Sequence, residues 1–202
     1  MGIFGEQVDG GSFSTLYLQT TGREYLYAVG DAPSSNGDVD SITIHTDGIW
    51  GTSINVHCAL YEYVDSTSSY MGSKLGVTET KEISDGTTNT YVSFDFSEPK
   101  PSVVSGTTYY LVVAASGNIA GGSNVCRISD GGTALPKCYE TSTTGIYLDD
   151  PKTGEEAVGG TVYLYATYTK TEEEPASTSL YFSGSGKLNF SGGSQQLQFM
   201  SV

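Results

Sequence analysis

Short stretches of alternating apolar and polar residues are the feature that most restricts how this 202-residue chain can fold. Between residues 91 and 96, for example, Val92, Phe94 and Phe96 fall on one face of an extended strand. Turn sequences such as Asp85-Gly86 recur every 8–15 residues between these stretches. A regular succession of short strands and turns is typical of an all-β domain.

The segments with this pattern are rich in β-branched and aromatic residues, which favour strands. No segment combines a 3.6-residue apolar period with helix caps, so we expect negligible helix and predict an antiparallel β-sandwich over residues 1–170. The predicted strands are Phe13–Gln19, Glu24–Val29, Val39–Thr46, Ser53–Tyr63, Leu75–Ile83, Thr90–Ser97, Thr107–Ala115, Asn124–Ser129, Lys137–Thr141, Gly145–Leu148 and Thr161–Lys170.

The alternation also predicts which side chains fill the core. Within Val39–Ile44, strict alternation places Val39 on the face opposite to Ile42 and Ile44. Burying each large apolar side chain stabilises the fold by about 1.5–3 kcal/mol. The expected core residues are Ile42, Ile44, Ile54, Val56, Leu60, Val92, Phe94, Phe96, Leu111, Val113 and Leu164.

The composition changes after the last predicted strand. Residues 171–178, TEEEPAST, predict a linker, and residues 179–202 carry a Leu-x-Phe pattern three times, spaced 8 and 9 residues apart. Three strands this short cannot form a core of their own, so we expect a β extension used for oligomerisation or attachment, with a flexible tail as the alternative. The apolar residues of this extension are Leu180, Phe182, Leu188, Phe190, Leu197 and Phe199.

The charge of the chain limits its partners. Nine Lys and Arg against 23 Asp and Glu give a formal net charge of −14, which repels phosphate backbones and anionic lipid surfaces. No run of 18 apolar residues is present, and the start of the chain does not resemble a secretory signal. We therefore expect no nucleic-acid or membrane partner, and we expect contacts with other copies of the chain, a trimer being one arrangement.

Enzymatic chemistry is not expected. The two histidines, His45 and His57, fall inside predicted strands without a partner residue that would make either one a base. The paired carboxylates, such as Asp149 and Asp150, fall in polar turns, whereas glycoside hydrolysis needs two carboxyl groups in a cleft with one pKa raised. No cofactor is predicted.

Two further kinds of site stay open at this level. The carboxylates of Asp31, Asp38 and Asp40 are weak candidates for a calcium site, with ordinary solvated turn acids as the alternative. Cys126 and Cys138 flank a glycine-bearing stretch and would close a hairpin by a disulfide in an oxidising environment, although three free thiols suit assembly in the cytoplasm.

Carbohydrate binding is the main alternative to a protein-binding role. β-Sandwich modules bind sugars by stacking them on exposed aromatic rings. Trp50, in a predicted turn, and Tyr61 and Tyr63, at a strand end, are the candidate glycan platforms. A plug at the end of the sandwich is the structural alternative for Trp50, and tyrosine-rich surfaces suit protein contacts equally well.

The order of several short motifs resembles a known class of viral domain. The motifs are Ala59-Leu-Tyr61, Phe94-Asp-Phe96, the run from Val103 to Val113 that contains Gly106-Thr-Thr-Tyr-Tyr110, and Leu164-Tyr-Ala-Thr-Tyr168. Together they resemble the jelly-roll sandwich domains of structural proteins from tailed phages and archaeal viruses, over residues 1–170. The resemblance implies a jelly-roll-like β-sandwich; residues 179–202 lie outside it.

The resemblance, the charge and the C-terminal extension together predict a non-enzymatic virion structural protein. We expect a capsid decoration, neck or tail-fibre accessory protein that binds itself and other virion structural proteins. It would be synthesised in the host cytoplasm and displayed on the virion surface, which also suits a chain that begins with Met but has an extracellular type of composition. The alternative is an extracellular carbohydrate-binding or cell-surface adhesion module.

Overall fold

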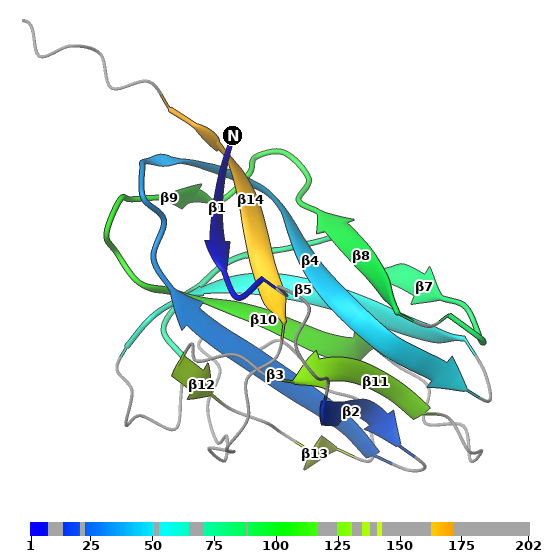
Figure 1. The fold of residues 1–202 in the computed structure, drawn as a ribbon. Coiled ribbons are helices and arrows are strands. Elements are labelled where there is room, and N and C mark those ends of the chain that lie inside the picture. The colour runs from blue at the N-terminus through cyan, green and yellow to red at the C-terminus, as the bar shows by residue number, and fades with distance from the viewer. Residues whose placement is uncertain are drawn as a thin grey trace, which may run out of the picture. The chain divides into compact units, whose positions relative to one another are not determined.

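A computed structural model describes residues 1–7, 14–20, 23–50, 53–64, 71–87, 89–116, 125–130, 135–137, 141–142 and 163–171, with the backbone alone in 14–20, 23–25, 47–50, 116, 125–130, 135–137 and 141–142. All regular structure in these residues is strand, and two antiparallel sheets pack against each other (Figure 1). The prediction of an antiparallel β-sandwich is confirmed. No helix in the described part of the chain is long and apolar enough to cross a membrane.

The first sheet is built around the long strand β4. One edge of β4 pairs first with β14 and then, beyond a short gap, with β11, while its other edge pairs with β8 and β9. β1 is the edge strand next to β14, and β2 follows β11. The strands of this sheet are β1 (Gly2–Gly5), β2 (Ser14–Thr20), β4 (Gly37–Trp50), β8 (Thr90–Asp95), β9 (Ser102–Val103), β11 (Val125–Asp130) and β14 (Leu164–Lys170).

The second sheet has the order β3-β10-β5-β6, with β7 also on β5 and β12 on the free edge of β3. β3 connects the two sheets, because its first residues pair with β2 and β13 whereas its later residues pair with β10. The strands of this sheet are β3 (Arg23–Asp31), β5 (Ile54–Glu62), β6 (Lys74–Val77), β7 (Lys81–Ile83), β10 (Tyr109–Ser116) and β12 (Leu135–Lys137), with β13 (Thr141–Ser142) beside the start of β3.

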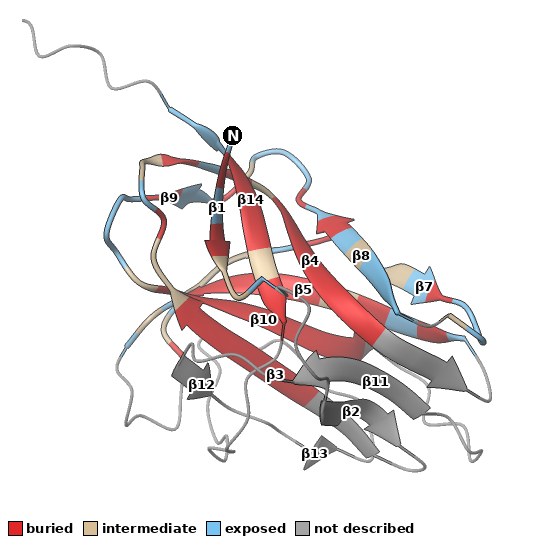
Figure 2. Ribbon diagram, in the orientation of Figure 1, coloured by how far each residue is buried: buried red, intermediate tan, exposed pale blue. Residues whose placement is uncertain are grey.

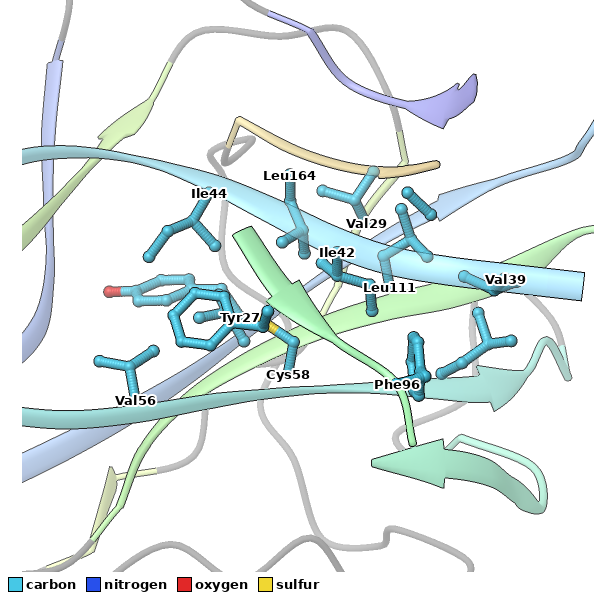
Figure 3. Close-up of a cluster of buried hydrophobic side chains, with 14 of the residues drawn as sticks. Tyr27, Val29, Val39, Ile42, Ile44, Val56, Cys58, Phe96, Leu111 and Leu164 are labelled. Atoms are coloured by element: carbon cyan, nitrogen blue, oxygen red, sulfur yellow. The ribbon is translucent and has the colours of Figure 1, made fainter. Parts of the chain in front are cut away.

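The interior of the sandwich consists of apolar side chains from both sheets (Figures 2 and 3). Every predicted core residue belongs to it, Val92 being half-buried at its margin. Phe94 and Ile42 face each other across β8 and β4 and are fully buried. The alternation therefore identified the inward face correctly.

One predicted strand is two strands in the structure. The segment 75–83 divides into β6 and β7, and Thr78 lies between them. The hydroxyl of Thr78 accepts a hydrogen bond from the Cys58 amide at 2.9 Å, and the Thr78 amide donates one to the Cys58 carbonyl at 2.9 Å. The side chain of Thr78 thus bonds the backbone of β5 at the point where the edge changes from β6 to β7.

Strict alternation fails at Asp40. Opposite β14, Thr167 pairs with Ser41 but the next residue, Tyr168, pairs with Val39, so Asp40 is the extra residue of a β-bulge. The bulge shifts the phase of β4, and Val39 enters the core on the same side as Ile42. The prediction that these two residues face opposite ways is therefore wrong.

A second apolar layer covers the outer face of the second sheet. Side chains of β3, β5 and β10 that point away from the sandwich interior form a separate buried cluster, to which Met71 also belongs. Strands that are buried on both faces read as continuous apolar runs instead of alternations. The members of this cluster are Leu26, Ala28, Ala59, Tyr61, Met71, Tyr110, Val112 and Ala114, with Tyr63 packed against it.

Candidate functional site

The bulge in β4 forms one wall of a pocket of about 390 Å³. The start of β4, the segment that leads into β9 and the end of β14 meet here, so residues far apart in the sequence come together. The lining is mostly polar and contains three acidic side chains and one lysine. The lining residues are Asp38, Asp40, Glu98, Pro99, Lys100, Ser102 and Thr169.

Hydrogen bonds within the pocket hold its carboxylates. The Lys100 ammonium lies 3.0 Å from one oxygen of Asp40, and the Thr169 hydroxyl donates to the other oxygen at 2.9 Å. The Ser102 hydroxyl donates to Asp38 at 2.6 Å. The hydrogen bond that Lys100 donates to Asp40 raises the pKa of Lys100, because it favours the charged ammonium. The pocket therefore offers carboxyl oxygens and hydroxyl groups, which hydrogen-bond polar ligands.

The three calcium candidates are not gathered in one place. Asp38 and Asp40 line the pocket, whereas one oxygen of Asp31 accepts a hydrogen bond from the backbone amide of Gly5, the last residue of β1. Among the described residues, no group of three or more His, Cys, Asp or Glu side chains is arranged to hold a metal ion. Asp40, in addition, is already paired with the Lys100 ammonium.

The candidate glycan platforms have different surroundings. Tyr61 is fully buried in the outer apolar layer, so its ring offers no surface for stacking a sugar. Tyr63 is half-buried and packs on Tyr110 with ring centroids 5.0 Å apart. Trp50 ends β4 opposite Val125, and its side chain lies outside the described part of the structure.

An exposed aromatic ring that sequence reasoning missed lies on β8. Tyr91 is 50% exposed and meets the buried His45 ring edge to face, with centroids 4.7 Å apart. The alternation places Tyr91 on the outward face of β8, but it does not show that a histidine of β4 holds the ring in position. This pairing across β4 and β8 is fixed by their register.

Of the three cysteines, only Cys58 has a described side chain. Cys58 is a free, buried thiol whose pKa is raised by burial, which keeps it protonated and unreactive. Cys126 lies on β11, but its side chain is outside the described part of the structure. Cys138 lies wholly outside the described residues. The C-terminal Leu-x-Phe residues, from Leu180 to Phe199, also lie outside the described residues. The chain divides into two compact units, Met1–Glu172 and Glu173–Val202.

Burial of His57 predicts a pH dependence of stability. Desolvation lowers the pKa of this imidazole from 6.5, so the native state favours the neutral form. The unfolded chain binds a proton more readily below about pH 6.5, so the stabilisation is present above that pH and is lost as pH falls through the folded pKa. Chemical denaturation at about pH 7.5 and 5.5 should show a smaller loss of unfolding free energy for His57→Gln than for the wild type. Equal losses would contradict this assignment.

Comparisons of the chain with protein-family models, with curated proteins and with solved structures gave no match. Function is therefore inferred from the residues of this chain and from the sandwich that they form.

Proposed function

We propose that this protein is a non-enzymatic structural component of a virus particle, such as a capsid decoration, neck or tail-fibre accessory protein. It acts through β-strand contacts with copies of itself and with other particle proteins. The observation that carries the proposal is the division of the chain between Glu172 and Glu173, inside the acidic linker. The Leu-x-Phe repeat thereby belongs to a different unit from the sandwich.

The free energy of ordering the C-terminal segment supports a role for it in binding another subunit. Six large apolar side chains offer on the order of 10 kcal/mol of gross burial. Ordering the 23 residues of Leu180–Val202 opposes this with about 1–2 kcal/mol for each residue. Pairing to a sheet edge of another subunit would add stabilisation that the isolated segment lacks, because it satisfies backbone donors and acceptors and covers the apolar faces.

The described polar side chains of the sandwich support a scaffold role. Ser41 and Thr167 share a buried hydrogen bond of 2.8 Å between β4 and β14, and Thr43 and Ser93 share a partly buried hydrogen bond of 2.7 Å between β4 and β8. These contacts tie neighbouring strands to each other. They suit a rigid domain that presents fixed surfaces to partners.

Carbohydrate binding is the second candidate function, and the pocket beside the bulge favours it. Carboxylates such as Asp38 and Asp40 are the groups that bind sugar hydroxyls in sandwich modules. A glycan array distinguishes the two functions: strong binding that is lost in Trp50→Ala or Asp38→Asn would support the sugar-binding function over the structural one.

The structural proposal is tested by changing the C-terminal segment in the full-length protein. Replacing Phe182, Phe190 and Phe199 together by serine should reduce an oligomer to a monomer of about 21.3 kDa, as measured by light scattering. The domain should keep its circular dichroism spectrum and its thermal midpoint, because the changes lie outside the sandwich unit.

The matched control replaces the polar residues Ser183, Ser191 and Ser194 of the same segment by alanine, and its mass should equal that of the wild type. A triple phenylalanine variant that keeps the wild-type mass, or a wild-type protein that is monomeric at every concentration measured, would count against the proposed function.

A further inference from the structure

We propose that the outer edge of β1 is the acceptor for the C-terminal Leu-x-Phe segment of a second copy of this chain. This inference rests on the proposed function and adds to it the place on the sandwich where the segment binds. β1 pairs with β14 on one side and with no other described strand on the other side.

The register shows which backbone groups of β1 point to that open side. Glu6 and Leu164 exchange two hydrogen bonds, of 2.9 and 3.1 Å. Hydrogen-bonded pairs alternate along antiparallel strands, so Phe4 bonds to β14 whereas the amide and carbonyl groups of Ile3 and Gly5 point away from it. The Gly5 amide donates to the Asp31 carboxylate. The amide and carbonyl of Ile3 are therefore the pair of backbone groups that can receive an added strand.

β1 lacks the features that protect other edges. Charged residues or a proline occur in each of the edge strands β6, β7, β8 and β12, and such residues oppose edge pairing. The free edge of β8 is also bonded by the Lys81 side chain at 2.6 Å and by the Glu79 amide at 3.0 Å. β1, with the sequence Gly-Ile-Phe-Gly, contains no charged residue or proline, and the Asp31 side chain bonds its edge at Gly5, beyond Ile3.

The side chains of β1 combine a firm anchor with an exposed apolar contact. Phe4 is buried, and its ring packs on Tyr109 and Tyr168 at centroid distances of 6.5 and 5.9 Å. Ile3 points the opposite way and is 45% exposed, and Met1, two residues earlier, is 82% exposed. A Leu-x-Phe strand paired through Ile3 would place its two apolar side chains on this same face.

The position of the chain exit supports this occupant. Gly2 pairs with Tyr168, so the last residues of β14 lie beside the beginning of β1 (Figure 1). The Thr171 amide donates to the Asn36 carbonyl at 3.0 Å, after which 31 residues remain, up to Val202. The eight residues 172–179 span at most about 28 Å when fully extended. A strand from another copy is free to pair antiparallel to β1, which is the more stable arrangement.

The first test replaces Ile3 by lysine in the full-length protein. The charge should block strand addition and reduce the light-scattering mass to that of the monomer, with the thermal midpoint unchanged because the side chain is exposed. Val104→Lys is the matched control: Val104 is 55% exposed and lies outside β1, so this variant should keep the wild-type mass.

The second test identifies the occupant. Ile3→Cys protein is mixed with Phe182→Cys, Phe190→Cys or Phe199→Cys protein and oxidised, and peptide mass spectrometry should find a disulfide between the two kinds of copy. An Ile3→Lys variant that keeps its mass would overturn the inference. Loss of mass without any such cross-link would also overturn it, because another segment would then occupy the edge.

The outcomes separate this inference from the proposed function. If the triple phenylalanine variant is monomeric while Ile3→Lys still assembles, β1 is not the acceptor and the structural function stands. If the triple variant still assembles, the proposed function fails as well.

Discussion

Phe94→Ala is expected to lower the free energy of unfolding by about 3–5 kcal/mol. The Phe94 ring is fully buried between the sheets, and it projects from β8 opposite Ile42 of β4. Alanine removes the buried surface of the ring and leaves a cavity that rigid neighbouring strands fill only in part. Chemical denaturation followed by circular dichroism measures the change.

Tyr91→Ala, three residues earlier on the same strand, is the matched control. Tyr91 is half exposed and keeps one ring contact, with His45, so its removal should lower the unfolding free energy by about 1 kcal/mol. Equal effects of the two substitutions would mean that β8 does not present Phe94 to the core.

Gly5→Ala is the second change with a large expected effect, about 3 kcal/mol or more. Gly5 has a φ of +102°, where a side chain is strained. A Cβ atom there would also lie 2.5 Å from the Leu164 carbonyl oxygen and 2.8 Å from the Tyr165 Cα atom. Because both contacts are with the backbone of β14, β1 would have to move away from its partner strand.

Gly86→Ala separates the effect of the positive φ from the effect of the close contact with β14. Gly86 also has a positive φ, of +82°, but a Cβ atom there would meet nothing within 4 Å. Its substitution should therefore lower the unfolding free energy by only about 1–2 kcal/mol, the effect of the backbone conformation alone. If Gly5→Ala were no more destabilising than Gly86→Ala, the close approach of β1 to β14 would be in doubt.

The sequence predicted the fold class and the sandwich interior because alternation directly reflects burial of one strand face. It did not predict the phase change at Asp40, since a bulge is defined by pairing with a partner strand and leaves no residue signature of its own. The outer apolar layer does have a signal in the sequence, but a search for alternation passes over it. Leu111-Val-Val-Ala-Ala115 is apolar at every position, as expected of a strand buried on both faces.

The candidate site was harder to predict for the same reason. Asp38 and Asp40 were singled out as neighbouring acids, but Lys100 and Thr169 join them through strand pairing over long sequence separations. A position at a strand end suggests an exposed ring for Tyr61, yet the second apolar layer buries it. The open edge of β1 could not be predicted either, because it depends on which strands lie beside β1 in the sheet.

The proposed place of this protein in a virus particle is tested most directly by quantitative peptide mass spectrometry of particles purified from the organism that encodes the chain. Its peptides should remain with the particles through a density gradient, at a constant ratio to the major coat protein. A chain that is made in the same cells but is absent from the purified particles would contradict the proposed place in the particle.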